Sequence, residues 1–417
     1  MTSLLSPRRE RWLLVTLAGV QFTHILDFMI MMPLGPQLTA LFGLSNAQFG
    51  MLVSAYTFSA GLSGLLATLY VDRFGRKRLL LVMYGLFALA TLACGLAPTY
   101  TALLVARVAT GLFGGVLSAL SQTIVADVVP FERRGRAMAV VMTSFSVSTV
   151  AGVPLGLFMA AHWSWQAPFI VIGLLAFVLQ GLAWLSLPRL DAHVAHVRGH
   201  GLLQAVRQVL LQRNHRRAFL LSACIMMSGF VVIPYITLYV QANGGLSAEQ
   251  VPWMYLSGGV ATLLTARQVG RWTDRRGKGP AFRRMALGVV PALLATTLSA
   301  GLPVAGVVLI STLLFTTMSA RMVPGMALVS SAADPRWRGT FMTLNSAVQS
   351  GAMGLAALVG GMVIGRDAQG HLTHYWVAGL MGAALSLLTI WLSQRVHLHA
   401  TPGPGMAPVS AASTSTR

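Results

Sequence analysis

The sequence has few charged residues for its length, and acidic residues are the scarcest of them. Only 10% of its 417 residues are charged, and 10 acids stand against 30 lysines and arginines, which gives a formal net charge of +20. A soluble protein needs roughly a quarter of its residues charged to cover its surface. The sequence therefore excludes an ordinary soluble domain, and its 55% hydrophobic content predicts that lipid surrounds most of the chain.

Cysteines and nucleotide-binding motifs are almost absent as well. Cys94 and Cys224 both lie inside apolar runs, where a small packing residue is the ordinary interpretation. No G-x-x-x-x-G-K-[ST] phosphate-binding loop is present, which argues against an ATP-driven pump. His193, His196 and His200 lack an acidic or cysteine partner at metal-binding spacing, so we expect neither a metal nor another cofactor.

Long apolar runs dominate the rest of the chain, and twelve of them have the length of about 20 residues that crosses a bilayer as a helix. The first run is too long for a signal-peptide core and has no small-residue cleavage site, so we expect it to be retained as a span. The approximate spans are 12–34, 49–70, 79–97, 101–126, 137–160, 167–187, 217–240, 251–272, 283–301, 303–328, 340–364 and 375–394.

The basic residues lie between these runs in an asymmetric pattern. If the N-terminus is cytoplasmic, every even-numbered span leads into a cytoplasmic loop, and these loops hold nearly all the loop arginines and lysines; only Arg366 lies in an outer loop. Basic residues resist translocation, so the pattern places both termini in the cytoplasm. This loop asymmetry also accounts for the net positive charge, so no nucleic-acid partner is needed to explain it. The pattern predicts a multi-pass protein of the cell inner membrane.

Short motifs recur at a nearly constant spacing and divide the chain into two copies. The repeated pairs are Gly43-Leu44-Ser45 with Gly245-Leu246-Ser247, Asp72-Arg73 with Asp274-Arg275, and Arg134-Gly135 with Arg338-Gly339. Gln48 and Gln250 follow the two serines by three residues, which is the pattern of a helix capping box. The sequence predicts an all-α membrane protein of twelve transmembrane helices in two pseudo-symmetric six-helix halves, a typical transporter arrangement.

The predicted halves are joined and followed by polar segments. We expect the N-terminal half at 1–187, a cytoplasmic central loop at 188–216, the C-terminal half at 217–397 and a disordered cytoplasmic tail at 398–417, because the tail is rich in Pro, Gly, Ser and Thr. The central loop carries an apolar helical face that predicts a short helix on the inner leaflet. That face consists of Leu202, Leu203, Val206, Val209 and Leu210.

A few ionisable residues lie inside the spans, where charge is costly and marks candidate functional sites. Asp27 is the only acid well inside a span, and His24 and Gln21 lie one and two turns before it. Arg107 lies in span 4 at the same depth as Asp27, roughly 10 Å below the outer ends of their helices. Asp27 is thus a candidate proton carrier coupled to Arg107 and His24, and a static structural ion pair is the alternative.

Other polar residues in the spans could line a central cavity. Arg321 in span 10 could bind an anionic group of a substrate or helix carbonyls, and Arg267 is close enough to the cytoplasm to snorkel. Hydrogen bonding between helices is the equally plausible alternative for the polar pairs in spans 5, 7 and 11. These candidate cavity residues are Gln21, Ser144, Ser148, Tyr235, Tyr239, Asn345 and Gln349.

The loop motif carries a resemblance to a known family. Residues 72–78 resemble the G-x-x-x-D-R-x-G-R-[KR] signature of the major facilitator superfamily, with Thr68 in place of its first glycine, and residues 270–278 resemble the second copy of that signature. In that family the two loop aspartates hold the cytoplasmic gate closed. The resemblance therefore implies a gate formed by Asp72, Arg73, Gly75, Arg76, Arg134, Arg136, Asp274, Arg275, Gly277 and Arg338.

Two further motifs refine the resemblance. Leu103 with Arg107 and Gly111 resembles the family's span-4 motif, whose arginine is linked to proton handling. Span 5 resembles the antiporter motif without its adjacent Gly-Pro and Gly-Gly pairs, and Gly152, Pro154 and Gly156 should in any case kink and thin this helix. Together with Asp27-Phe28-Met29 and Pro33-Leu34 in span 1, these motifs are most similar to the drug- and sugar-efflux branch.

The sequence thus predicts a secondary transporter that exports a small drug-like or sugar-like organic solute by proton antiport, with no enzymatic activity and acting as a monomer. Proton-coupled uptake is the alternative within the same class. A non-transporting membrane sensor and an intramembrane protease are alternatives of other classes. The protease would use Ser63 of Gly61-Leu62-Ser63-Gly64, which needs a facing histidine.

The orientation is testable with topology reporters. A reporter that is active only inside the cell should be active when fused after residue 72, and a reporter that is active only after export should be active when fused after residue 98, because the first point follows an even-numbered span and the second an odd-numbered one. The opposite pattern of activities would show that the predicted orientation is inverted.

Overall fold

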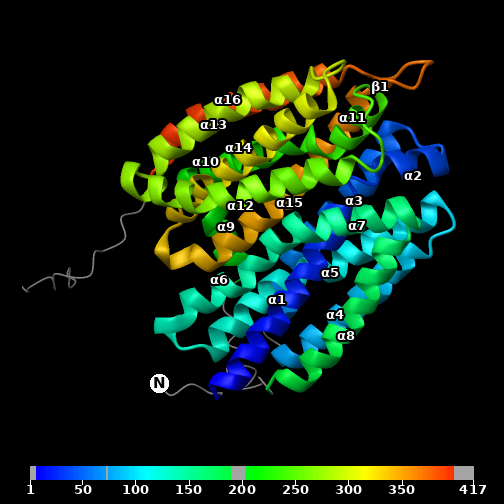
Figure 1. Cartoon of the computed structure of the whole chain (residues 1–417). Coiled ribbons are helices and arrows are strands. Elements are labelled where there is room, and N and C mark those ends of the chain that lie inside the picture. The colour runs from blue at the N-terminus through cyan, green and yellow to red at the C-terminus, as the bar shows by residue number, and fades with distance from the viewer. Residues whose placement is uncertain (1–5, 72–73, 189–201, 399–417) are drawn as a thin grey trace, which may run out of the picture.

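The computed structural model of the chain describes residues 6–71, 74–188 and 202–398, and these residues are nearly all helical (Figure 1). The first part of the chain contains α1 (Pro7–Ile30), α2 (Gly35–Phe42), α3 (Asn46–Tyr70), α4 (Arg76–Gly95), α5 (Tyr100–Val128), α6 (Phe131–Val147), the π-helix η2 (Ser148–Gly152), α7 (Val153–His162) and α8 (Ala167–Ser186).

The second part begins with α9 (Leu202–Leu211), which packs against α10 and α15. The elements after it are α10 (Arg213–Phe230), the 3-10 helix η4 (Ile233–Tyr235), α11 (Ile236–Ala242), α12 (Val251–Arg276), α13 (Lys278–Thr297), α14 (Val304–Ser331), the 3-10 helix η5 (Pro335–Trp337), α15 (Arg338–Val363), a hairpin of β1 (Gly365–Arg366) and β2 (Leu372–Thr373), and α16 (Tyr375–Arg395).

Within the described residues, ten helical segments are long and apolar enough to cross a membrane. Two more, α12 and α13, have 26 and 20 residues and pack against α14 and α16 like the others. Both contain arginines near one end, and charged residues lower the mean hydropathy of a segment. The all-helical membrane fold is confirmed, and the count of twelve spans agrees with these ten segments and two more polar helices.

The helices form two groups. Helices α1 to α8 pack mainly against one another, and helices α10 to α16 do the same. Figure 1 shows the first group, in blue and cyan, below the second, in green to red. We use "basic end" for the end of both groups that carries residues 76–78, 133–136, 275–278 and 336–338, and "far end" for the opposite end, where α2, α11 and the β hairpin lie.

The two groups contact each other toward the far end. Helix α3 packs along α15, α2 packs on α11, and η2 with α7 packs on α12. Asn46, the first residue of α3, donates hydrogen bonds to the backbone carbonyls of Ile364 (3.0 Å) and Gly365 (3.3 Å). The side chain of Tyr235 fills the space between α3 and α15 and donates a hydrogen bond to the carbonyl of Ala357.

Glycines set the distance between these helices. A Cβ atom on Gly361 would lie 2.5 Å from the backbone oxygen of Asn46, and one on Gly111 would lie 2.4 Å from the backbone oxygen of Tyr56. Helix α3 is therefore in backbone contact with α5 on one side and with α15 on the other. Such close approach through small residues is the usual way in which helices associate in lipid.

The two predicted capping boxes differ. At the start of α3 the Ser45 hydroxyl accepts from the Gln48 amide at 3.2 Å, and the Gln48 side chain accepts from the Ser45 amide at 2.9 Å, so the box is complete. In the second copy only the bond from the Ser247 amide to the Gln250 side chain (3.1 Å) is present. Helix α12 begins at Val251 with Pro252 in its first turn, so residues 247–250 form a separate turn, and the prediction of a second full box is wrong.

The glycine contact between the two groups yields a stability prediction. Gly361→Ala should lower the unfolding temperature in detergent, because the added methyl group forces α3 and α15 apart, and overpacking of this kind costs about 1–3 kcal/mol. Gly351→Ala on the same helix is the matched control, since no atom lies within 4 Å of a Cβ built there. Equal shifts in the two variants would contradict the proposed contact.

Candidate functional site

The only salt bridge with both side chains fully buried among the described residues joins α1 to α5. Arg107 Nη1 lies 2.8 Å from Asp27 Oδ2, and neither side chain is exposed. The same nitrogen lies 3.3 Å from the backbone oxygen of Asp27. The matched depths of the two residues in the sequence thus correspond to a direct contact, and Arg107 holds both the carboxylate and the backbone of α1.

The hydrogen bonding of this pair is incomplete. Within the described residues, Asp27 Oδ1 and Arg107 Nε and Nη2 are buried and have no hydrogen-bond partner. Unsatisfied buried polar atoms are rare in folded proteins and often mark functional positions. The Thr91 hydroxyl interacts weakly with the Asp27 carboxyl, but Oδ1 has no hydrogen bond of ordinary geometry among the described residues, so this oxygen could accept a proton.

An aromatic residue connects the pair to His24. The guanidinium carbon of Arg107 lies 4.6 Å from the centre of the Tyr56 ring, which is a cation–π contact. The Tyr56 hydroxyl shares a hydrogen bond of 2.7 Å with His24 Nδ1, and Phe28 stacks on the same ring at 5.1 Å. Sequence reasoning missed Tyr56 because an aromatic residue inside an apolar span is ordinary; its position opposite Arg107 is a property of the packing of α3 on α5.

Helix α1 is positioned by a stripe of small residues in span 5. The hydroxyls of Ser144 and Ser148 donate to the carbonyls of Ala18 (2.7 Å) and Phe22 (3.1 Å). One and two steps further along, glycines face larger side chains of α1: Gly152 lies against Leu26, and Gly156 against Ile30. The stripe thus advances four residues per step on both helices.

This stripe favours one of the two alternatives for Ser144 and Ser148 and shows where the predicted kink residues lie. Ser144 and Ser148 are buried and bond between helices, so they do not line a cavity in this structure. The predicted kink residues fall where the helix changes: Gly152 ends the π-helix η2, and Pro154 lies in the first turn of α7. A π-turn there lets the chain accommodate a proline that has no amide proton to donate.

Two further candidate cavity residues, Gln21 and Gln349, also bond between helices. Gln21 of α1 exchanges hydrogen bonds with Ser118 of α5, at 3.0 and 3.1 Å. The Gln349 side chain of α15 donates to the Ser222 hydroxyl of α10 at 2.9 Å. Asn345 is buried, and its Oδ1 has no hydrogen-bond partner among the described residues.

Tyr235 and Tyr239 are buried near the far end rather than along a cavity. Tyr235 packs between α3 and α15, as described above, and the Tyr239 hydroxyl accepts a hydrogen bond of 3.2 Å from the Ala300 amide. In this structure both residues belong to the contact region at that end, which agrees with the alternative of hydrogen bonding between helices.

Arg321 is fully buried and surrounded by neutral groups. Its guanidinium donates to the hydroxyls of Ser228 (2.7 Å) and Ser386 (3.3 Å) and to the backbone carbonyl of Ile225 (3.0 Å). No acidic residue among those the structure describes pairs with it. Of the two alternatives from the sequence, the structure shows Arg321 bound to a helix carbonyl and to neighbouring hydroxyls.

The predicted gate residues contact groups in their own half. Arg76 Nε lies 3.5 Å from Asp127 Oδ2, Arg134 donates to the carbonyl of Ala126 at 2.6 Å, and Arg338 donates to the carbonyl of Ser330 at 3.4 Å. Gly75 and Gly277 precede α4 and α13, and Gly277 has a φ of 82°, which favours glycine. Arg136 and Arg275 are exposed.

Asp72 and Arg73 lie outside the described residues, and so do His193, His196 and His200. Asp274 is exposed at the basic end of α12. The halves meet toward the far end in this structure, so the role of Asp274 in a closed gate at the basic end stays a prediction.

Ser63 does not have the surroundings of a catalytic nucleophile. Its hydroxyl donates to the carbonyl of Leu112 on α5, so it bonds to the backbone of a neighbouring helix. Among the described residues, His24 is bonded to Tyr56 and not to Ser63.

A model of the Major Facilitator Superfamily matches residues 17–357. The chain belongs to this family. It is 26% identical over 349 residues to the uncharacterized MFS-type transporter YtbD of Bacillus subtilis, covering 82% of this chain and 85% of that protein. It is 26% identical over 254 residues to a probable sugar efflux transporter of Helicobacter pylori, covering 61% of this chain and 63% of that protein.

The fold is also that of a solved member of the family. A D-xylose-proton symporter superposes with a TM-score of 0.74 at 19% sequence identity, over 92% of this chain and 97% of the other. The predicted family and fold class are confirmed. The protein is a membrane transporter of a small molecule and not an enzyme, since the relatives are named transporters.

The buried pair can be tested by a double-mutant cycle on stability. Asp27→Asn should destabilise the protein by about 3–5 kcal/mol, because it leaves the Arg107 charge buried without a partner. Adding Arg107→Gln should recover part of this loss. The control is Glu10→Gln, which breaks the pair of Glu10 with the half-exposed Arg133 and should cost within about 1 kcal/mol.

Thermal unfolding in detergent measures all of these variants. Losses from Asp27→Asn and Arg107→Gln that simply add in the double variant would show that the two residues do not act as a pair.

Proposed function

We propose that this transporter exports a small drug-like or sugar-like organic solute in exchange for protons, by alternating access across the cell inner membrane. Both termini lie in the cytoplasm, the basic end faces the cytoplasm, and the protein acts as a monomer. The observation that carries the proposal is the buried pair of Asp27 and Arg107 with its unsatisfied carboxylate oxygen.

Asp27 is the proton carrier in this proposal. Loss of its negative charge on protonation removes the electrostatic attraction to Arg107, which is strong because the site excludes water. The contact that joins α1 to α5 then weakens, and the arginine remains over the Tyr56 ring. Protonation thus changes the packing of α1 inside the N-terminal half, and the change in packing couples to the alternation between the two open states.

His24 and Tyr56 connect the carrier to the basic end. His24 precedes Asp27 by three residues on α1, which is about 4.5 Å along the helix axis, and its side chain is only partly buried. A neutral imidazole and a hydroxyl can each donate and accept a hydrogen bond, so these two side chains can pass a proton between them. The hydrogen bond of 2.7 Å between His24 and Tyr56 makes these two residues the proposed route between Asp27 and the cytoplasm.

The other predicted site residues take supporting roles. Asn345, whose Oδ1 has no hydrogen-bond partner among the described residues, is the proposed substrate-side residue of the C-terminal half. In the proposal, Arg321, Gln349 and Gln21 contact the substrate in a state in which their present hydrogen bonds to neighbouring helices are open. The exposed Asp274 is free to join the gate when the basic end closes. Asp72, Arg73, Arg76, Arg134 and Arg338 complete that gate in the proposal.

Export rather than uptake is supported by a relative. The Helicobacter pylori protein with 26% identity is named a probable sugar efflux transporter. The motifs of span 1 and span 5, which resemble the efflux branch, agree with this direction. A flux measurement also separates the transporter from a non-transporting sensor.

The decisive experiment is transport in inverted membrane vesicles. An imposed pH gradient, acidic inside, should drive accumulation of a substrate found by screening drugs and sugars, because protons leave the vesicle as the solute enters. Asp27→Asn should reduce this proton-driven accumulation by at least tenfold while retaining exchange of labelled for unlabelled substrate. Asp367→Asn, in the hairpin at the far end, is the control and should transport normally.

Full proton-driven transport by Asp27→Asn would show that Asp27 is not the carrier. Accumulation that requires the opposite gradient would show that the protein imports its substrate.

A further inference from the structure

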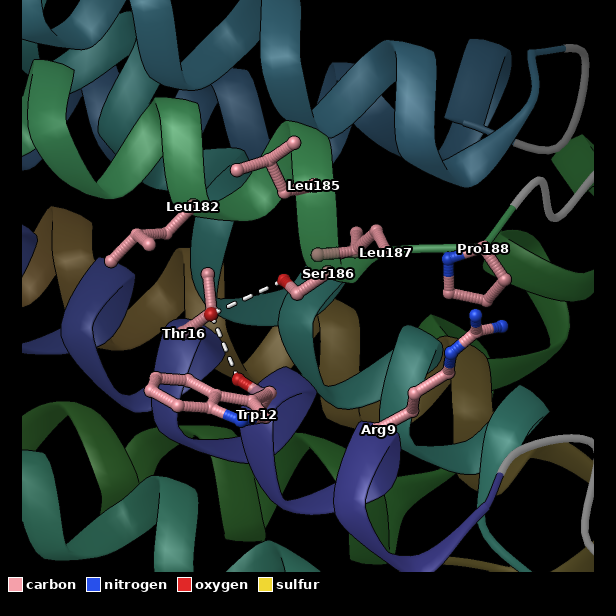
Figure 2. Close-up of a pocket in the computed structure, with 8 residues that line it drawn as sticks. All are labelled: Arg9, Trp12, Thr16, Leu182, Leu185, Ser186, Leu187 and Pro188. Carbon is pink, nitrogen blue, oxygen red and sulfur yellow. Dashed lines mark hydrogen bonds between the residues drawn. The ribbon is translucent and has the colours of Figure 1, made fainter.

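The described surface carries a groove on the outside of the N-terminal half, away from the buried pair. It has a volume of about 460 Å³ and lies between the start of α1 and the end of α8 (Figure 2). That volume falls within the range of about 300–1,000 Å³ that ligand pockets usually have. Its lining residues are Arg9, Trp12, Thr16, Leu182, Leu185, Ser186, Leu187 and Pro188.

A hydrogen-bonded floor holds the two helix ends together beneath the groove. The Thr16 hydroxyl donates to the carbonyl of Trp12 at 2.8 Å and accepts from the Ser186 hydroxyl at 3.2 Å, as the dashed lines of Figure 2 show. Thr16 is buried, and the bond from Ser186 connects α8 to α1 beneath the groove, whereas the bond to Trp12 lies within α1. The groove is thus part of the packed structure of the bundle rather than a gap between loose ends.

The walls above this floor are apolar and exposed. The exposed fractions are 56% for Trp12 and 73% for Leu185. Neither side chain is covered by another element in the described structure, and both lie on the outside of a helix bundle that is surrounded by lipid. Tryptophan is enriched where hydrocarbon meets the headgroups, so this wall lies at the depth at which an acyl chain joins its headgroup.

The mouth of the groove carries positive charge, and within the part of the chain that the structure describes Arg9 has no acidic partner. Arg9 is exposed, and its side chain extends toward Pro188 in Figure 2. The one acid of the first turn of α1, Glu10, is buried and paired with Arg133 at 3.1 Å. Lys77 lies beside the same helix end, because its Nζ donates to the carbonyls of Trp184 (2.6 Å) and Leu187 (2.7 Å).

We propose that this groove binds an anionic phospholipid of the leaflet at the basic end, with the phosphate at Arg9 and an acyl chain along Trp12 and Leu185. The guanidinium of arginine recognises phosphate oxygens with two parallel hydrogen bonds. An acyl chain in the groove would contact the apolar walls in place of the acyl chains of neighbouring lipids. Lys77 adds a second positive charge near the headgroup and favours a lipid with net negative charge over a zwitterionic one.

The test uses native mass spectrometry of the full chain in detergent, with phosphatidylglycerol or phosphatidylethanolamine of the same acyl chains added. Wild type should retain phosphatidylglycerol in preference. Arg9→Gln should weaken that retention about fivefold, the effect of one cation near an anionic headgroup. Arg11→Gln is the matched control, because Arg11 is also exposed but does not line the groove and lies about 200° around the helix from Arg9.

A second pair of variants tests the acyl wall without changing charge. Leu185→Ser should weaken retention of phosphatidylglycerol, whereas Leu174→Ser, an exposed position on α8 outside the groove, should not. Equal loss in Arg9→Gln and Arg11→Gln would overturn the site in favour of a diffuse basic surface. Equal retention of the two lipids by wild type, or displacement of phosphatidylglycerol by inorganic phosphate, would overturn it as well. Transport is not measured, so the outcome is independent of the proposed function.

Discussion

Helix α3 is packed at backbone distance against two partners, and both the site and the joining of the two halves depend on this packing. Apolar side chains gain little by leaving lipid for another helix, so close van der Waals contact must hold the helices together. Gly111 admits α3 against α5 on one side, and Gly361 admits it against α15 on the other. Tyr56 lies on the first of these surfaces, so the same contact that fixes α5 places an aromatic ring over Arg107.

The two halves treat their buried arginines differently. Arg107 has a carboxylate partner whose charge a proton can cancel, whereas Arg321 is bound by hydroxyls and a carbonyl, which keep their state at all ordinary pH values. A change of buried charge is therefore concentrated in the N-terminal half. In the proposed cycle the C-terminal half thus keeps its buried charge, while the buried charge of the N-terminal half changes.

Much of the architecture followed from the sequence because its physical causes are local. Apolar length, the positions of the arginines and the Ser45 capping box each depend on residues that are close in the chain, and so does the break in span 5. Matched depth left an ion pair or a shared cavity open for Asp27 and Arg107, since helices that cross the same bilayer bring residues of equal depth into reach, and the structure shows the ion pair. The helix at Leu202–Leu211 also followed from the spacing of its apolar residues.

The remainder depends on which face each helix turns to its neighbours, and the sequence does not determine this. Ser144, Ser148 and Gln21 are polar residues in spans and were consistent with a cavity or with a neighbouring helix; only the packing of α1 showed that they bond to helices. Tyr56 carried no distinguishing signal in the chain. The repeat predicted that Ser247 would cap a helix as Ser45 does, but Pro252 moves the start of α12 past it.

The stripe in span 5 has a consequence for how α1 is held. The stripe contacts α1 at every fourth residue, through Ser144, Ser148, Gly152 and Gly156. If α1 slid along its axis by four residues, about 6 Å, the stripe would therefore still face residues of α1 at the same spacing. Small, repeating contacts of this kind do not by themselves select one register. Two polar contacts between α1 and α5 select the register: Gln21 with Ser118 and Asp27 with Arg107. The ion pair thus fixes the position of α1 along its axis.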